Sequence, residues 1–222
     1  MEQLQEVSRI IALTLGVAWA SGINLYAAIL VLGILGSTGN MTLPPGLELL
    51  TDPLVLTAAG LMYVFEFFAD KIPGVDTGWD ALSTFIRIPA GALLAANAVG
   101  DVNPAVSLAA GILGGLVSAG THAGKAGARV LINTSPEPFS NSIASVTEDA
   151  AVFGGMWMAI RHPNLFLAAF LCFTIVLAWA LPRIWRGIRA VYGRVRSFLG
   201  GRPQETFAVV RAGSTEDDRP TV

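Results

Sequence analysis

Six polar or ionisable residues stand within or beside long apolar runs, where an unpaired charge is costly. They are Asn24, Glu66, Asp70, Arg87, Glu148 and Asp149. Glu66 and Asp70 are four residues apart, so both side chains would lie on one face of a helix. Such groups either line a path for an ion or small polar solute, or pair with one another to fix helix geometry. We therefore take the six as a candidate binding site or ion pathway, with a purely structural ion network as the alternative.

Three further ionisable side chains, His122, Lys125 and Arg129, stand near the start of the longest polar interruption, residues 120–149. They could hold an anionic lipid headgroup or an anionic substrate. The alternative is that they mark the cytoplasmic side, with a histidine at the surface. The run GTHAGKA resembles a phosphate-binding loop, but it is one residue short of GxxxxGK and Ala126 replaces the required Ser or Thr. We exclude nucleotide binding.

The same interruption holds a motif of prolines and polar residues: Ser135, Pro136, Glu137, Pro138 and Asn141. A residue that precedes proline is disfavoured in a helix. The motif therefore predicts a stiff, non-helical stretch, typical of a lid or a re-entrant loop. Irregular backbone at membrane depth persists only where it is buried in protein or lines water. We expect function to concentrate here.

No arrangement for catalysis or metal binding is evident. The serines of residues 135–142 have no evident base, and His122 and His162 are expected on opposite sides of a membrane. The single cysteine, Cys172, lies inside an apolar run. We predict no enzyme, no cofactor and no metal.

The composition predicts a membrane protein. Of the 222 residues, 53% are hydrophobic and 14% are charged, against about 25% charged in a soluble domain. So few charges cannot cover a water-facing surface, and the apolar runs suit the roughly 20 residues of helix that cross a bilayer. We expect the lipid bilayer as a partner and no nucleic acid.

The apolar runs predict six transmembrane helices. Their approximate bounds are 9–36, 53–69, 84–100, 104–120, 143–160 and 164–182. With this count one side receives Arg9, Lys71, Arg87, Lys125, Arg129 and the eight arginines after residue 182, and the other side receives Arg161. Basic residues gather on cytoplasmic segments. We therefore predict a protein of the cell inner (plasma) membrane with both termini in the cytoplasm.

Two spans carry small or polar residues with a packing consequence. The first holds Ser21, Gly22 and Asn24 near its middle, where glycine permits close approach or a break and a buried amide needs a partner. The fourth holds Gly111 and Gly115, followed by Ala119, at four-residue spacing, which predicts a face for close helix contact.

An internal repeat relates two helical hairpins. Residues 52–62 (DPLVLTAAGLM) match residues 103–113 (NPAVSLAAGIL) at an offset of 51. Asp52 and Asn103 are good N-caps, and each precedes a proline at the first helical position. The match predicts parallel repeats related by an axis along the membrane normal, with chance similarity among small residues as the alternative. The hairpins cover residues 52–100 and 103–160.

The repeat also predicts an ion pair. The second copy carries ten extra loop residues, so the offset beyond the loop becomes 61. Arg87 then corresponds to Glu148, and the two should approach each other near the repeat axis. We predict that Arg87 pairs with Glu148 or Asp149.

The C-terminal part differs from the membrane domain, residues 1–182. Residues 183–199 combine apolar residues at helical spacing with arginines, which predicts an amphipathic helix on anionic lipids of the inner leaflet. The tail, residues 200–222, is polar and contains Gly, Pro and acidic residues, which predicts disorder.

Several motifs together resemble one family. They are Gly22-Ile-Asn-Leu-Tyr26, Asp70-Lys-Ile-Pro73, and Ser135-Pro-Glu-Pro-Phe-Ser-Asn141 with Glu148-Asp149. Over roughly residues 10–180 the chain is similar to small bacterial multi-pass membrane proteins known as domain of unknown function 4126. The resemblance implies a membrane fold and supplies no activity, substrate or site.

We therefore predict an all-α integral membrane protein with six transmembrane helices, a duplicated parallel-repeat hairpin formed by spans 2–3 and 4–5, and a C-terminal amphipathic helix. The leading hypothesis is a transporter or channel for an ion or small polar solute. The alternative is a non-transporting scaffold or accessory subunit whose buried charges are structural. A homo-oligomer or a membrane protein partner is compatible with both hypotheses.

Overall fold

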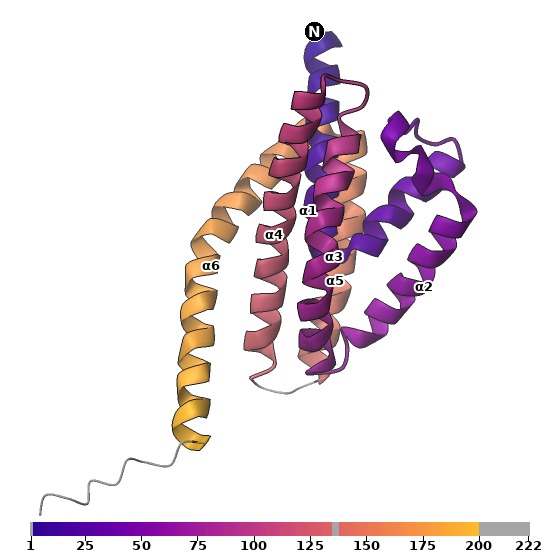
Figure 1. Ribbon diagram of the computed structural model, residues 1–222. Coiled ribbons are helices and arrows are strands. Elements are labelled where there is room, and N and C mark those ends of the chain that lie inside the picture. The colour runs from indigo at the N-terminus through magenta and orange to yellow at the C-terminus, as the bar shows by residue number, and fades with distance from the viewer. Residues whose placement is uncertain (1, 135–137, 200–222) are drawn as a thin grey trace, which may run out of the picture. The chain divides into compact units, whose positions relative to one another are not determined.

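The structure is a computed structural model of the chain, and it describes residues 2–134 and 138–199. Within these residues the fold is helical and contains no strand, which confirms the expected all-α class (Figure 1). The elements are α1 (Glu2–Ser37), the 3-10 helix η1 (Pro45–Thr51), α2 (Pro53–Ala69), α3 (Val75–Ala98), α4 (Pro104–Ile132), α5 (Pro138–Arg161) and α6 (Pro163–Leu199).

The chain divides into two compact units. The first ends at Ile188 and contains α1 to α5 with most of α6, and the second begins at Arg189. The expected amphipathic segment, 183–199, belongs to α6, which contains Pro182 in its interior. Its position on the inner leaflet stays a prediction. The tail, 200–222, lies outside the described residues.

The helix starts follow the predicted capping. The side chains of Asp52 and Asn103 each accept a hydrogen bond from the backbone N–H two residues on, at 2.7 and 2.9 Å, and a proline follows each cap. Both predicted N-caps are confirmed. The turns that follow α2 and α3 contain Gly74 (φ 87°) and Gly100 (φ 79°), where glycine tolerates the left-handed backbone.

Among the described residues, four helices are long and apolar enough to cross a membrane: α1, α3, α4 and α6. The pair formed by η1 and α2, bent by 69°, is a fifth candidate. The chain is therefore a multi-pass membrane protein. α5, expected as the fifth of six spans, falls outside this group, because its first half carries Ser, Asn, Thr and acidic residues.

α1 is a broken helix and not the single straight span expected over residues 9–36. Asn24 has extended backbone angles (φ −147°, ψ 98°), which divide α1 into two arms. Arg9 of the first arm and Arg161 of α5 line one cavity, and Leu35 of the second arm lines another with Arg161. The break thus returns the chain to the end from which it entered (Figure 1). The predicted placement of Arg9 and Arg161 on opposite sides is therefore wrong.

The first arm of α1 packs against α3, α4 and α5, and the most extensive helix contact joins α3 to α4. Part of this contact depends on small residues. A Cβ added to Gly111 would meet the Cβ of Ala96 at 3.3 Å, and one on Gly115 would meet that of Ala92 at the same distance. The predicted close-packing role of Gly111 and Gly115 is confirmed.

Helices extend into the segments expected as cytoplasmic loops. α3 begins at Val75, not near residue 84, and α4 continues to Ile132, not residue 120. Polar residues persist in these helices because they bind one another, as described below. Pro138 is the first residue of α5. Ser135, Pro136 and Glu137 lie outside the described residues, as does their expected lid or re-entrant conformation.

Candidate functional site

The break at Asn24 leaves backbone groups of two helix ends inside the protein, where side chains satisfy them. The carbonyl oxygen of Ile23 accepts hydrogen bonds from Arg87 Nη1 at 2.8 Å and from Lys125 Nζ at 3.1 Å. Asn24 Oδ1 accepts one from the N–H of Ala27 at 3.0 Å and so caps the second arm. Two cations therefore face the negative dipole end of the first arm.

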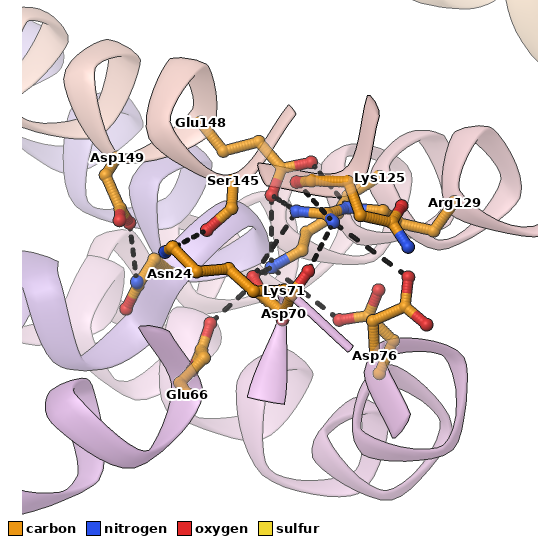
Figure 2. A network of polar contacts seen from close by, with 12 residues as sticks. Asn24, Glu66, Asp70, Lys71, Asp76, Lys125, Arg129, Ser145, Glu148 and Asp149 are labelled. Carbon is orange, nitrogen blue, oxygen red and sulfur yellow. Dashed lines mark hydrogen bonds and ion pairs between the residues drawn. The ribbon is translucent and has the colours of Figure 1, made fainter. Parts of the chain in front are cut away.

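Polar stripes on α3 and α4 meet the break. The stripe of α3 consists of buried residues at helical spacing: Asp76, Asp80, Ser83 and Arg87. The stripe of α4 is equally buried: Ser118, His122, Lys125 and Arg129. We call the ionisable members of both stripes, with those of α2, α5 and the α2–α3 turn that approach them, the charge network. Its members are Glu66, Asp70, Lys71, Asp76, Asp80, Arg87, His122, Lys125, Arg129, Glu148 and Asp149. Figure 2 labels those around Lys125 and Arg129, together with Asp149.

Arg87 lies at the inner end of the charge network. Its Nη2 donates to Glu66 Oε1, and its Nη1 lies 3.5 Å from Asp80 Oδ1. Arg87 and Glu66 are both fully buried. The predicted pairing of Arg87 with Glu148 or Asp149 is wrong, because α2 supplies the partner of Arg87 while cations of α4 bind Glu148.

Lys125 lies among four carboxylates. Its Nζ donates to Asp70 Oδ2 at 3.0 Å and lies 3.5 Å from Glu66 Oε1, 3.7 Å from Asp80 Oδ1 and 3.4 Å from Glu148 Oε2. These acids come from α2 and its C-cap, α3 and α5. One ammonium group therefore joins three other helices to α4.

Arg129 binds the start of α5 to the end of α2. Its Nε and Nη2 donate to Glu148 Oε1 at 3.2 Å and Oε2 at 2.7 Å, which is the bidentate geometry of a strong charged pair. Its Nη1 donates to the carbonyl oxygens of Asp70 at 2.9 Å and Asn141 at 3.2 Å. Glu148 is the more accessible partner, with a side chain 21% exposed.

His122 is buried, so the surface position considered for it is wrong. Its Nδ1 lies 3.3 Å from Arg87 Nη1, which can only donate. Its Nε2 lies 3.0 Å from the carbonyl oxygen of Asp80, which can only accept, and 2.7 Å from Thr84 Oγ1. These contacts assign a neutral imidazole with its proton on Nε2.

Amides close the network where α3 begins. Asp76 Oδ1 accepts from the N–H groups of Gly74 at 2.8 Å and Thr77 at 2.6 Å. Asn133 Nδ2, from the C-cap of α4, donates to both oxygens of Asp76 at 2.8 and 3.0 Å. Asn141 Nδ2 in turn donates to Asn133 Oδ1 at 2.7 Å. Three helix ends are thus joined without a further charge.

Asp149 and Lys71 lie at the side of the network. Asp149 Oδ1 accepts from Asn24 Nδ2 at 3.0 Å (Figure 2). Lys71, in the α2–α3 turn, donates to the carbonyl oxygen of Phe67 at 3.0 Å and lies over the ring of that residue. Burial lowers the pKa of Lys71, and the nearby carboxylates of Asp149 and Asp70 act in the opposite direction.

A cavity reaches the network from one side. It has a volume of about 320 Å³ and lies between α1, α4, α5 and α6. Lys125 and Glu148 line it together with Trp19, Phe173, Leu177 and other mainly apolar residues. Over residues 2–134 and 138–199, no group of three or more His, Cys, Asp or Glu residues could hold a metal ion.

The structure joins residues that the sequence offered as separate groups. The expected pathway residues Asn24, Glu66, Asp70, Arg87, Glu148 and Asp149 lie together with the expected anion contacts His122, Lys125 and Arg129. Asn141 of the loop motif belongs to the same region. Sequence reasoning missed Asp76 and Asp80, because residues 70–83 were expected to be a loop. Their signal is the helical spacing of 76, 80, 83 and 87.

A comparison with known proteins gives a family and no activity. No curated protein and no solved structure matches the chain. Residues 11–183 match the family described as domain of unknown function, DUF4126, and this range contains every member of the charge network. The chain therefore belongs to the DUF4126 family of membrane proteins.

Proposed function

We propose that this protein is a small transporter or channel for an ion or small polar solute, and that the charge network lines its pathway. The observation that carries the proposal is the break of α1 at Asn24, within the membrane domain. A helix that only crossed a membrane would satisfy its own backbone groups throughout. Broken helices in transporters direct their dipole ends at a bound ligand, and here the dipole end of the first arm faces Arg87 and Lys125.

The extent of the polar column also supports a pathway. On α4 it runs from Ser118 to Asn133, about 22 Å at the rise of an α-helix, against a hydrocarbon core of about 30 Å. Beyond Ser118 the α3–α4 contact is mainly glycine against alanine, with one hydrogen bond from Ser107 to the carbonyl oxygen of Ala96. A column that is polar over most of its length and closed at one end fits a transporter captured with access from a single side.

The distribution of basic residues orients the protein in this proposal. Lys71, Lys125 and Arg129 belong to the network end, whereas Arg9 and Arg161 line a cavity at the opposite end. Basic residues favour the cytoplasm, so the network end faces inward in the plasma membrane. The N-terminus is then outside, which replaces the earlier expectation, and α6 leads back to the cytoplasm.

The proposal counts α5 as a further span, because it packs along the first arm of α1. α2 to α6 then cross the membrane one after another, and α1 enters and returns. The hairpins α2–α3 and α4–α5 run in the same direction, as the proposed parallel repeat requires, and each begins with the same cap and proline.

The test is flux through purified protein in liposomes. Currents on a solid-supported membrane would be recorded after concentration jumps of H⁺, Na⁺, K⁺ and Cl⁻ applied one at a time. The variant Asn24→Ala removes the side chain that caps the second arm and binds Asp149. Asp101→Asn, in the exposed α3–α4 turn, is the matched control.

We expect a current for at least one of these ions in the wild type and in Asp101→Asn, and a loss of at least tenfold in Asn24→Ala. Equal currents in protein-free and protein-containing liposomes for every ion would overturn the proposal for ions. Counterflow of radiolabelled amino acids and sugars would then decide the case of a polar solute.

A scaffold or accessory subunit is the second candidate, and one observation favours it. Arg87, Lys125 and Arg129 each bind a carboxylate and also a backbone carbonyl of another helix. Such a network clamps helices in place without any ligand. This function predicts no flux and a membrane partner that copurifies with the wild type.

A further inference from the structure

The charge network contains more acids than bases. Its carboxyl groups are Glu66, Asp70, Asp76, Asp80, Glu148 and Asp149, and its cations are Lys71, Arg87, Lys125 and Arg129. His122 is neutral by its contacts. Full ionisation would leave two negative charges without a counter-charge in the membrane domain, which is costly. Something positive must therefore balance part of this excess.

Among the carboxyl groups of the charge network, Asp80 is the one whose two oxygens accept no hydrogen bond. Its side chain is 1% exposed. Its two nearest cations, Arg87 Nη1 and Lys125 Nζ, lie 3.5 and 3.7 Å from Oδ1. An ionised carboxylate without hydrogen bonds is among the most expensive groups to bury, whereas the neutral acid costs far less.

The other five carboxyl groups each accept at least one hydrogen bond. Arg87 donates to Glu66, Lys125 to Asp70, and Arg129 to both oxygens of Glu148. Two backbone N–H groups and Asn133 donate to Asp76, and Asn24 donates to Asp149. Hydrogen bonds of this kind favour the ionised form. Asp80 is therefore the favoured place for one of the two balancing charges.

The surroundings of Asp80 favour a proton over a metal ion. An ammonium and a guanidinium group lie within 4 Å of Oδ1 and oppose any added positive charge at that oxygen, so a proton would bond to Oδ2. A metal ion would need several ligands, and the described residues contain no group of three or more that could hold one. A proton bonded to Oδ2 adds no bulk and removes the charge at its source. The O–H bond can be broken again by transfer of the proton to a water molecule that enters from the cavity.

We propose that Asp80 binds an exchangeable proton and that this proton is the coupling ion of the transport process. The second clause rests on the proposed function, and the first does not. Lys125 Nζ lies 3.7 Å from Asp80 Oδ1 and 3.4 Å from Glu148 Oε2, whose side chain is partly exposed, so the cavity that Lys125 and Glu148 line comes close to Asp80. The charged ammonium group has no lone pair that could accept a proton, so water in this cavity takes the proton from Asp80 and returns it.

Charged and titratable groups from each packed helix face this site. They are Glu66 of α2 with Asp70 at its C-cap, Asp76 and Arg87 of α3, His122, Lys125 and Arg129 of α4, and Glu148 of α5, with Tyr26 of α1 near Glu66 and Arg87. Gain or loss of the proton changes the charge of Asp80 that faces Arg87 and Lys125. Both cations also donate hydrogen bonds to the carbonyl oxygen of Ile23. Proton binding is thereby linked to the break in α1.

The first experiment compares two isosteric neutralisations one helical turn apart on α3, Asp80→Asn and Asp76→Asn. Infrared difference spectroscopy of the full-length protein in liposomes detects the carbonyl stretch of a protonated carboxyl group, which carboxylates lack. We expect this band in the wild type at neutral pH, its loss in Asp80→Asn and its retention in Asp76→Asn. We also expect Asp80→Asn to melt at the wild-type temperature and Asp76→Asn to melt lower, because Asp76 loses charged hydrogen bonds.

A wild-type spectrum without the band, or a band that survives in Asp80→Asn, would overturn the proton site whether or not any flux is found. An equal loss of melting temperature in both variants would also count against it.

In a second experiment, a pH gradient is imposed on liposomes that contain a pH-sensitive dye. We expect the wild type to dissipate it at least tenfold faster than Asp80→Asn. If the band behaves as expected but no gradient dissipates, the site stands and proton coupling fails.

Discussion

The α3–α4 contact consists of two halves with different physical chemistry. From Gly91 to Ala98, α3 meets α4 through glycine and alanine at close approach. From Asp76 to Arg87, it meets α4 through buried charges. Ser118 stands at the boundary, where its hydroxyl donates to the carbonyl oxygen of Arg87 at 3.0 Å. One pair of helices thus contains an apolar half and a polar half.

The halves differ in how many arrangements they permit. In the apolar half the backbones approach so closely that a single methyl group has no room, which leaves one packing. In the polar half, Lys125 lies within 4 Å of four carboxylates, so the loss or gain of one charge redistributes contacts without separating the helices. We infer that the apolar half fixes the fold and that the polar half can respond to a ligand.

The largest expected effect comes from the polar half, through Arg87→Met. This variant leaves Glu66 buried without its main counter-charge, which costs about 3–5 kcal/mol. We expect this variant to lower the melting temperature more than Gly114→Ala, Asn24→Ala or Ser118→Ala does, measured in detergent by intrinsic tryptophan fluorescence.

A double-mutant cycle locates the partner of Arg87. Glu66→Gln should recover most of the stability lost in Arg87→Met, because the excess charge disappears with it. Glu148→Gln combined with Arg87→Met should give no recovery, since Arg129 and Lys125 bind Glu148. If the double mutant with Glu148→Gln recovered stability and the one with Glu66→Gln did not, Arg87 would pair with Glu148 as the repeat predicted, and the observed geometry would be wrong.

The apolar half is broken by Gly114→Ala. The added Cβ would overlap the Cβ of Ala95 and meet the carbonyl oxygen of Gly91 at 3.0 Å, and overpacking of this kind costs about 1–3 kcal/mol. Gly154→Ala is the matched control, because a Cβ there meets nothing within 4 Å. We expect Gly114→Ala to melt below the wild type at every pH, and Gly154→Ala to melt at or above it. Equal behaviour of the two variants would refute the close fit.

A smaller effect is expected at the break of α1, where the polar half of the α3–α4 contact meets this helix. Asn24→Ala removes an N-cap worth about 1 kcal/mol and the donor to Asp149. Asn24→Ser keeps a capping oxygen, so it should retain most of the melting temperature while losing the contact with Asp149. If both variants lost the same amount, the cap would contribute nothing and the break would depend on Arg87 and Lys125 alone.

The sequence predicts the apolar half better than the polar half. The spacing of Gly111 and Gly115 is enough to predict close packing, because small residues at helical spacing have few other uses in lipid. Asp52 and Asn103 can likewise be predicted as N-caps from the sequence, because an N-cap bonds to the backbone of residues that follow it directly.

The polar half depends on contacts between distant segments, which hydropathy does not encode. Low hydropathy at Asp76, Asp80 and Arg129 suggested loops, whereas the helices persist because partners from other helices satisfy these groups. The sequence Ser21-Gly-Ile-Asn24 is compatible with a break in the helix and with close helix packing. Only tertiary contacts distinguish the two, and the structure has the break. Because the break returns α1 to the end from which it entered, Arg9 lies at the same end of the membrane domain as Arg161.

The smallest expected effect is at the boundary, through Ser118→Ala. Its hydroxyl is fully buried and donates one hydrogen bond to a helix carbonyl, and such interhelical bonds average about 0.6 kcal/mol in membrane proteins. Ser8→Ala, whose hydroxyl bonds within its own helix at an exposed position, is the control and should leave the melting temperature unchanged. A loss in Ser118→Ala as large as that of Gly114→Ala would place the boundary inside the fixed half. A small loss, combined with an altered pH dependence of flux, would assign Ser118 to the half that responds to protons.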